Sequence, residues 1–136
     1  MKHIPWIVLV VAGLLVLSCG DTNPSQPPPP PDPIPGWLRI RLNSPNTDDG
    51  GIMFTVSGGQ IDSVRSSYPE VFFSPGTPSL RRIIVAGDLP SGSVLAEIMV
   101  PDVQSVADYA TTVEQAAARE TFEQRAVSGY SLVVER

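Results

Sequence analysis

The chain has 136 residues, with 14 acidic and 9 basic side chains and 15 prolines, and its length suits one domain with additional segments. Its single lysine, histidine and cysteine are Lys2, His3 and Cys19. The sequence after Cys19 therefore excludes internal disulfides, Cys/His metal sites, His general bases and Schiff-base lysines. The 8 arginines and 14 acidic residues after Cys19 give a net charge of −6, which argues against nucleic-acid binding.

Residues 1–18 have the pattern of a secretory signal peptide. Lys2 and His3 form a short basic start, and residues 4–17 carry no charge. A basic start, a short apolar run and a small residue before the cleavage site are typical of such signals. The alternative, a transmembrane helix, needs about 20 apolar residues, which is more than this run provides.

The signal ends in Val16-Leu17-Ser18-Cys19, which resembles the lipobox of bacterial lipoproteins. The resemblance implies that the Cys19 sulfur receives a diacylglyceryl group and that cleavage makes Cys19 the new N-terminus. Stable anchoring takes two membrane signals, which a multiply acylated cysteine supplies. In enteric lipoproteins an Asp after the cysteine favours the inner membrane, and here Gly20 follows. The resemblance thus implies a cell-envelope protein, lipid-anchored at the outer membrane and facing the periplasm or the surface.

Residues 19–36 are predicted to be the lipidated cysteine and a disordered, proline-rich linker. Eight prolines lie between Gly20 and Gly36, at positions 24, 27–31, 33 and 35. Proline fixes φ and lacks an N–H, so this segment is expected to sample polyproline II and to act as a semi-rigid spacer. An alternative is a ligand for a proline-recognising domain, because Pro28 and Pro31 fit a PxxP pattern.

Residues 37–136 are predicted to form a mainly β domain, a small antiparallel β-sandwich. Apolar and polar residues alternate in short runs separated by Gly- and Pro-rich turns, as in half-buried strands. Leu38, Ile40 and Leu42 are expected to face inward. The runs flanking residues 87–92 are interpreted as a hairpin with a longer loop. The predicted strands are 37–42, 52–57, 61–65, 71–73, 80–86, 93–100 and 129–135.

Residues 103–127 allow two interpretations. Val103, Val106 and Ala110 have helical spacing, and the run of alanines at 116–118 favours a helix. Residues 109–113 contain β-formers that alternate, which favours a strand over about 109–117. We expect the strand; a helix within 103–127 would make the class α+β.

Two turn-rich segments carry a family resemblance. Asp48-Asp49-Gly50-Gly51 precedes one β-run, and Val85 to Gly92 (VAGDLPSG) precedes another. This pattern resembles cohesin-type and immunoglobulin-like sandwiches. The resemblance implies the sandwich fold and no particular ligand.

A partner surface is predicted from aromatic and basic side chains. Trp37, Arg39 and Arg41 share the outward face of the first strand, where they suit a cation–π surface. The alternative is an edge strand whose charges discourage sheet-to-sheet aggregation. Phe72 and Phe73 are adjacent on a strand and should point to opposite faces, one into the core and one toward a partner. The alternative is a second packed layer that buries both.

Asp48 and Asp49 are the most conspicuous carboxylate pair. They lie in a Gly-rich turn and are expected to be solvated turn residues. One alternative is a weak Ca²⁺ site in which Asn46, Asp48 and Asp49 supply oxygens, although the spacing does not match an EF-hand. Another is a hydrolase that uses two of several carboxylates. The carboxylates considered are Asp48, Asp49, Asp62, Asp88 and Glu97.

The chemistry available after Cys19 favours a non-enzymatic protein without a cofactor. We expect a membrane-anchored envelope lipoprotein whose sandwich binds a protein or a glycan, or serves in an envelope assembly. The alternatives are the carboxylate hydrolase and a passive structural surface lipoprotein.

Overall fold

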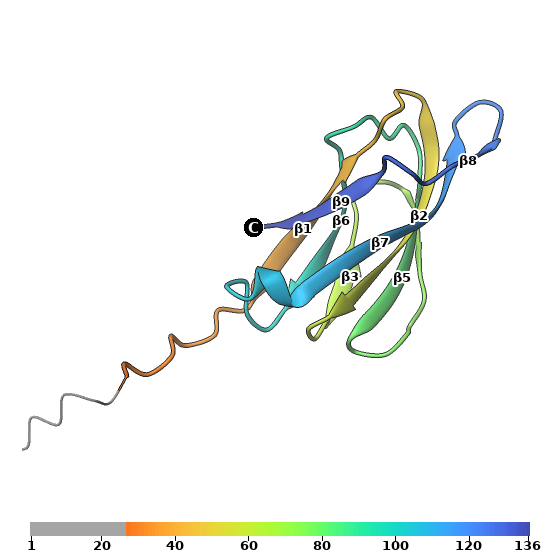
Figure 1. The fold of residues 1–136 in the computed structure, drawn as a ribbon. Coiled ribbons are helices and arrows are strands. Elements are labelled where there is room, and N and C mark those ends of the chain that lie inside the picture. Colours follow the sequence, from red (N-terminus) through yellow and green to blue (C-terminus); the bar gives the residue numbers. More distant parts are fainter. Residues whose placement is uncertain (1–26) are drawn as a thin grey trace, which may run out of the picture. The chain divides into compact units, whose positions relative to one another are not determined.

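The computed structural model describes residues 27–136, and the predicted signal peptide and the Cys19 lipidation site lie outside these residues. Within residues 31–136 the chain folds into two antiparallel sheets (Figure 1). The four-stranded sheet has the order β3-β6-β1-β9, and its strands are β1 (Gly36–Asn43), β3 (Ser63–Arg65), β6 (Val94–Val100) and β9 (Ser131–Glu135). None of the described residues belongs to a helix long and apolar enough to cross a membrane.

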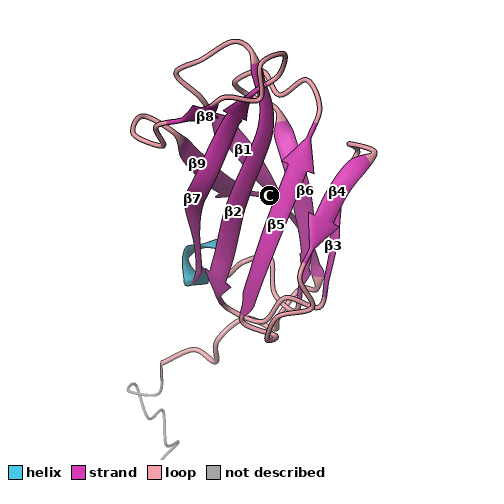
Figure 2. Cartoon of the chain, turned by 90° about the vertical axis from the view of Figure 1, so that its right-hand side faces the viewer, coloured by secondary structure: helices cyan, strands magenta, loops and turns pink. Residues whose placement is uncertain are grey.

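The five-stranded sheet has the order β4-β5-β2-β7-β8, and Figure 2 looks onto it. The long strand β2 lies at its centre, between β5 and β7, and the short strands β4 and β8 form its edges. The predicted small antiparallel β-sandwich is therefore confirmed. Its strands are β2 (Asp49–Gly58), β4 (Glu70–Phe73), β5 (Leu80–Ala86), β7 (Tyr109–Ala118) and β8 (Gln124–Arg125).

The core lies between the two sheets and follows from the alternation of each strand. Leu38, Ile40 and Leu42 of β1 are fully buried, as the sequence predicts. Alternate residues of a strand point to opposite faces, so one apolar face of each sheet supplies this layer. The facing sheet contributes Ile52, Phe54 and Val56 from β2 and Ile83 and Val85 from β5.

The ambiguous segment 103–127 is mainly a strand. A single 3-10 turn (Val106–Asp108) leads into β7, which pairs with β2 along its whole length. The prediction of a strand over 109–117 is confirmed, and the α+β alternative is wrong. Tyr109 and Ala116 are buried between the sheets, so tertiary burial outweighs the helical propensity of the alanines.

The predicted hairpin between residues 80–86 and 93–100 is wrong. β5 pairs with β2 in one sheet, whereas β6 pairs with β1 and β3 in the other. The connection therefore crosses between the sheets, and it is held there by Leu89, which is fully buried and whose N–H donates to the Asp49 carbonyl (3.1 Å).

The last residues of the predicted linker contact the domain. The Ile34 N–H donates to Asp102 Oδ1 (3.1 Å), and the Val103 N–H donates to the Ile34 carbonyl (2.8 Å). Gln104 Nε2 donates to the carbonyl of Asp32 (2.9 Å). The folded unit thus includes residues that precede Trp37, the predicted start of the domain.

We predict that Leu89→Ala destabilises the domain by about 2–5 kcal/mol, because it leaves a cavity between the sheets. Pro90→Ala is the matched control, since Pro90 is exposed in the same loop and its replacement should change stability by less than about 1 kcal/mol. Urea unfolding of the full chain measures both. Equal stability of the two variants would contradict the crossing loop.

We predict that the contact of Asp102 with Ile34 is lost at a pH below the ordinary carboxyl range. Backbone N–H donors from Gln104 and Ile34 lower the pKa of the Asp102 carboxyl. A lowered pKa means that the contact is present above the ordinary carboxyl range, near 4, and is lost as the pH falls through the lower folded value. NMR titration of the Ile34 amide measures the midpoint, and a midpoint at or above 4 would be the opposite result.

Candidate functional site

The residues of the predicted partner surface lie on two different sheets. Trp37, Arg39 and Arg41 belong to β1 of the four-stranded sheet. Phe72 and Phe73 belong to β4, at one edge of the five-stranded sheet. The structure therefore does not bring these five residues together into one surface.

The outer face of the four-stranded sheet carries paired charges. Arg65 of β3, rather than Arg39 or Arg41, stacks over Trp37 at 3.9 Å from the ring centroid, which corrects the predicted cation–π partners. Arg65 also pairs with Glu97 (2.6 Å). β1 lies between β6 and β9, so the alternative interpretation of β1 as an edge strand is wrong.

The pair Arg41–Glu135 links β1 to β9 on the same face (2.6 Å). Its hydrogen bonds and attraction raise the pKa of the Arg41 guanidinium and lower that of the Glu135 carboxyl. Arg39 donates to the main-chain carbonyl of Arg136. The arginines of this face are thus engaged by protein acceptors.

Phe72 and Phe73 are both exposed, at 60% and 51%, so the prediction that one of them enters the core is wrong. Phe72 pairs with the outward-facing Ile84. Phe73 pairs with the buried Ile83, but β4 is the edge strand and no further strand covers its ring. Position at the edge, rather than alternation, decides its exposure.

Asp49 is fully buried at the start of β2, so the prediction that both adjacent carboxylates are solvated is wrong for this residue. It accepts hydrogen bonds from the hydroxyls of Ser44 and Tyr130, the latter at 2.6 Å. Asn46 Nδ2 donates to the Tyr130 hydroxyl (2.7 Å). Burial and the bond to Asp49 raise the pKa of Tyr130.

These contacts bear on the proposed Ca²⁺ ligands Asn46, Asp48 and Asp49. Arg125 donates to Asp48 Oδ2 (2.6 Å), and its Nε lies 3.7 Å from Asp49 Oδ1. A guanidinium thus already neutralises both carboxylates, as in an internal polar network. Among the described residues, no group of three or more His, Cys, Asp or Glu side chains is arranged to hold a metal.

The five carboxylates considered for hydrolysis are each held by a protein group. Asp49 belongs to the network described above, and the other four are bound by an arginine or an amide. The contacts are Arg125 with Asp48, Gln60 with Asp62, Arg119 with Asp88 and Arg65 with Glu97.

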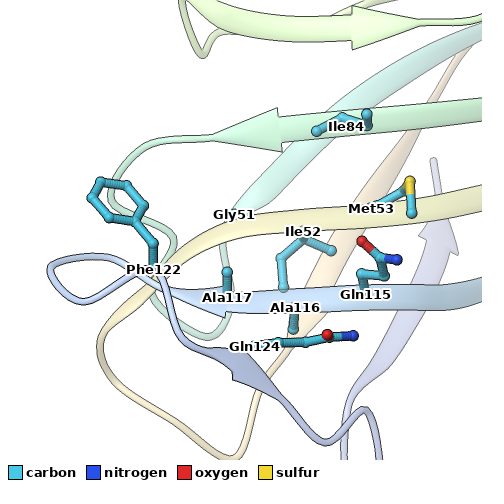
Figure 3. Close-up of a pocket in the computed structure, with 9 residues that line it drawn as sticks. All are labelled: Gly51, Ile52, Met53, Ile84, Gln115, Ala116, Ala117, Phe122 and Gln124. Carbon is cyan, nitrogen blue, oxygen red and sulfur yellow. The ribbon is translucent and has the colours of Figure 1, made fainter.

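The outer face of the five-stranded sheet contains a shallow depression of about 290 Å³ (Figure 3). Phe122 lies at one end and Gln115 with Met53 at the other, with Gly51 and Ala117 between them. None of the lining residues is charged. They are Gly51, Ile52, Met53, Ile84, Gln115, Ala116, Ala117, Phe122 and Gln124.

Phe122 has a backbone conformation that is unfavourable for its residue type. Its φ is +57°, and it is the one non-glycine residue with positive φ in the part of the chain that the structure describes. The turn between β7 and β8 holds it there, with its N–H donating to the Ala118 carbonyl (3.2 Å). A bulky residue at positive φ is an outlier, and such outliers concentrate at functional sites. Its side chain is 81% exposed, so burial does not compensate for the strain.

Gly51 keeps the middle of the depression open. It pairs with Ala86 of β5 and Ala117 of β7, so it lies inside the sheet rather than in a turn. A Cβ added at Gly51 meets nothing within 4 Å, and its φ is not positive. The β2–β7 register shifts between Asp49 and Gly51, and glycine in a strand often marks such a bulge, although Gly51 itself has neither positive φ nor a crowded Cβ position. By contrast, a Cβ at the neighbouring Gly50 would lie 2.2 Å from the Arg119 Cα.

Sequence reasoning missed Phe122, Gly51, Gln115 and Gln124. Phe122 lies in a polar stretch between strands, and no pattern in that stretch indicates a positive φ. The sequence predicts a turn at Gly50-Gly51, whereas both residues belong to β2. The one available sequence signal is an aromatic residue within the otherwise polar run of residues 119–125.

Comparison with protein-family models, with curated proteins and with solved structures finds no match to this chain. The candidate site therefore rests on its own geometry.

We predict that Asp49→Ala destabilises the domain by about 3–5 kcal/mol, because Ser44 and Tyr130 lose a buried acceptor and the Arg125 guanidinium loses a nearby counter-charge. Asp48→Ala is the matched control. The Asp48 side chain is 55% exposed, so losing its ion pair should change stability by less than about 1 kcal/mol. Thermal and urea unfolding measure both variants, and similar losses in the two would argue against the buried network.

Proposed function

We propose that this chain is a lipid-anchored cell-envelope protein whose β-sandwich is a non-catalytic binding module. The anchor part of the proposal rests on the signal-like residues 1–18 and on Cys19. The binding part rests on the outer face of the five-stranded sheet, where the uncharged depression next to Phe122 offers the ligand site.

One observation carries the binding proposal: a strained and exposed Phe122 beside an open depression. A phenylalanine at positive φ destabilises the folded chain, and this ring recovers little by burial. Exposed aromatic side chains are frequent anchors in recognition. Because this side chain does not stabilise the fold, contact with a ligand is the simplest explanation for its presence at this position.

The alternatives fit the contacts less well. A hydrolase needs a carboxylate free to move a proton or attack a substrate, whereas the five considered carboxylates are held by arginine, amide or hydroxyl donors. In a passive surface protein, the strained and exposed Phe122 would lower stability without serving a purpose. In a binding module, its ring can contact the ligand.

The anchor is tested by fatty-acid labelling of the full chain in its own cell. We expect wild-type protein to incorporate labelled palmitate and to partition into detergent, and Cys19→Ala to lose the label. Ser25→Ala, in the same linker, is the control and should keep it. Label retained by Cys19→Ala would disprove lipidation at this residue.

The binding module is tested by co-sedimentation of the detergent-solubilised, full-length protein with cell-envelope fragments. We expect saturable retention that Phe122→Ser weakens at least about tenfold, corresponding to about 1.4 kcal/mol. Val133→Ser is the control, because Val133 is an exposed apolar residue of the opposite sheet. Retention that is not saturable, or that both variants change equally, would favour the passive alternative.

A further inference from the structure

We infer that the depression beside Phe122 binds a neutral sugar ring of a glycan. This inference rests on the proposed binding function and names the ligand class for the same site. Phe122 would supply a stacking surface at one end, and the amides of Gln115 and Gln124 would supply hydrogen bonds (Figure 3).

The charge distribution favours a neutral ligand. The lining residues carry no ionisable side chain. Glu114, next to Gln115, is neutralised by Arg82 of β5 at 2.9 Å. Glu123, between Phe122 and Gln124, is exposed and repels anions. An acidic glycan or a phosphorylated ligand would therefore meet no cation in the depression.

The polar groups match hydroxyl groups. Gln115 and Gln124 are both exposed, and both line the depression. A carboxamide offers both donors and an acceptor, and so do the hydroxyls of a sugar. The negative face of the Phe122 ring attracts the polarised C–H groups on the apolar face of a sugar ring.

The space suits one ring rather than a protein surface. A volume of about 290 Å³ lies at the lower limit for small-molecule pockets, about 300 Å³. Stable protein interfaces bury about 1,200 Å² or more around well-packed anchors. Gly51 follows the register shift between β2 and β7 and keeps the centre of the depression open, and glycine in a strand also occurs where a ligand approaches the backbone closely.

Gly51→Val gives the decisive variant because it separates binding from folding. The added side chain fills the depression and meets nothing within 4 Å at its Cβ. Valine favours strands, so the melting temperature should stay unchanged or rise. A loss of binding with retained stability would assign the site to the depression itself.

The probes are the neutral oligosaccharides cellohexaose, maltohexaose and chitohexaose, with oligogalacturonate as the anionic comparison. We expect calorimetry to detect binding of at least one neutral probe to the full-length protein in detergent. It should detect no binding of oligogalacturonate. Gly51→Val and Phe122→Ala should each weaken binding at least about tenfold. Val133→Ala, on the opposite sheet, should bind like the wild type.

Other outcomes would contradict the inference. Binding of oligogalacturonate in preference to the neutral probes would show that the depression does not select a neutral ligand. Neutral-probe binding that Gly51→Val leaves intact would place the site elsewhere. If no probe binds while retention on envelope fragments still depends on Phe122, the ligand is not a neutral glycan, and a protein partner replaces it. If that retention is also absent, the proposed function fails as well.

Discussion

The pairing of β2 between β5 and β7 is the constraint on which the rest of the structure depends. Its inward residues Ile52, Phe54 and Val56 form much of the core, whereas its outward residues Gly51 and Met53 line the depression. Because side chains alternate along a strand, a shift of one residue in register would exchange the two sets. The core and the candidate site are therefore fixed by the same hydrogen-bond register.

The start of β2 also holds one end of the sandwich together. Asp49 accepts hydrogen bonds from Ser44 and Tyr130, on the connections that lead into β2 and β9, and its own carbonyl accepts the N–H of Leu89. These contacts join three connections that cross between the sheets. A buried carboxylate is tolerated here because donors surround it and Arg125 lies nearby.

The two outer faces of the sandwich differ in chemistry, and this difference locates the proposed site. On the four-stranded sheet, Arg41 and Arg65 are paired with Glu135 and Glu97. On the five-stranded sheet, Phe122 is strained and exposed, and the amides of Gln115 and Gln124 line the depression beside it. Arginines that already pair with carboxylates of the protein have little free hydrogen-bonding capacity for a ligand. The exposed ring and amides at the depression can still contact one.

The sequence by itself determined the strands with clear alternation and their inward faces, since the alternation in 37–42 and 52–57 is a local property of the chain. It did not determine which strands pair. β5 and β6 belong to different sheets because they pair with β2 and β1, which are distant from them in sequence. Tertiary structure alone separated Trp37 from Phe72 and placed Phe122 beside Gly51. Exposure and proximity arise from the packing of the sheets, which no local pattern records.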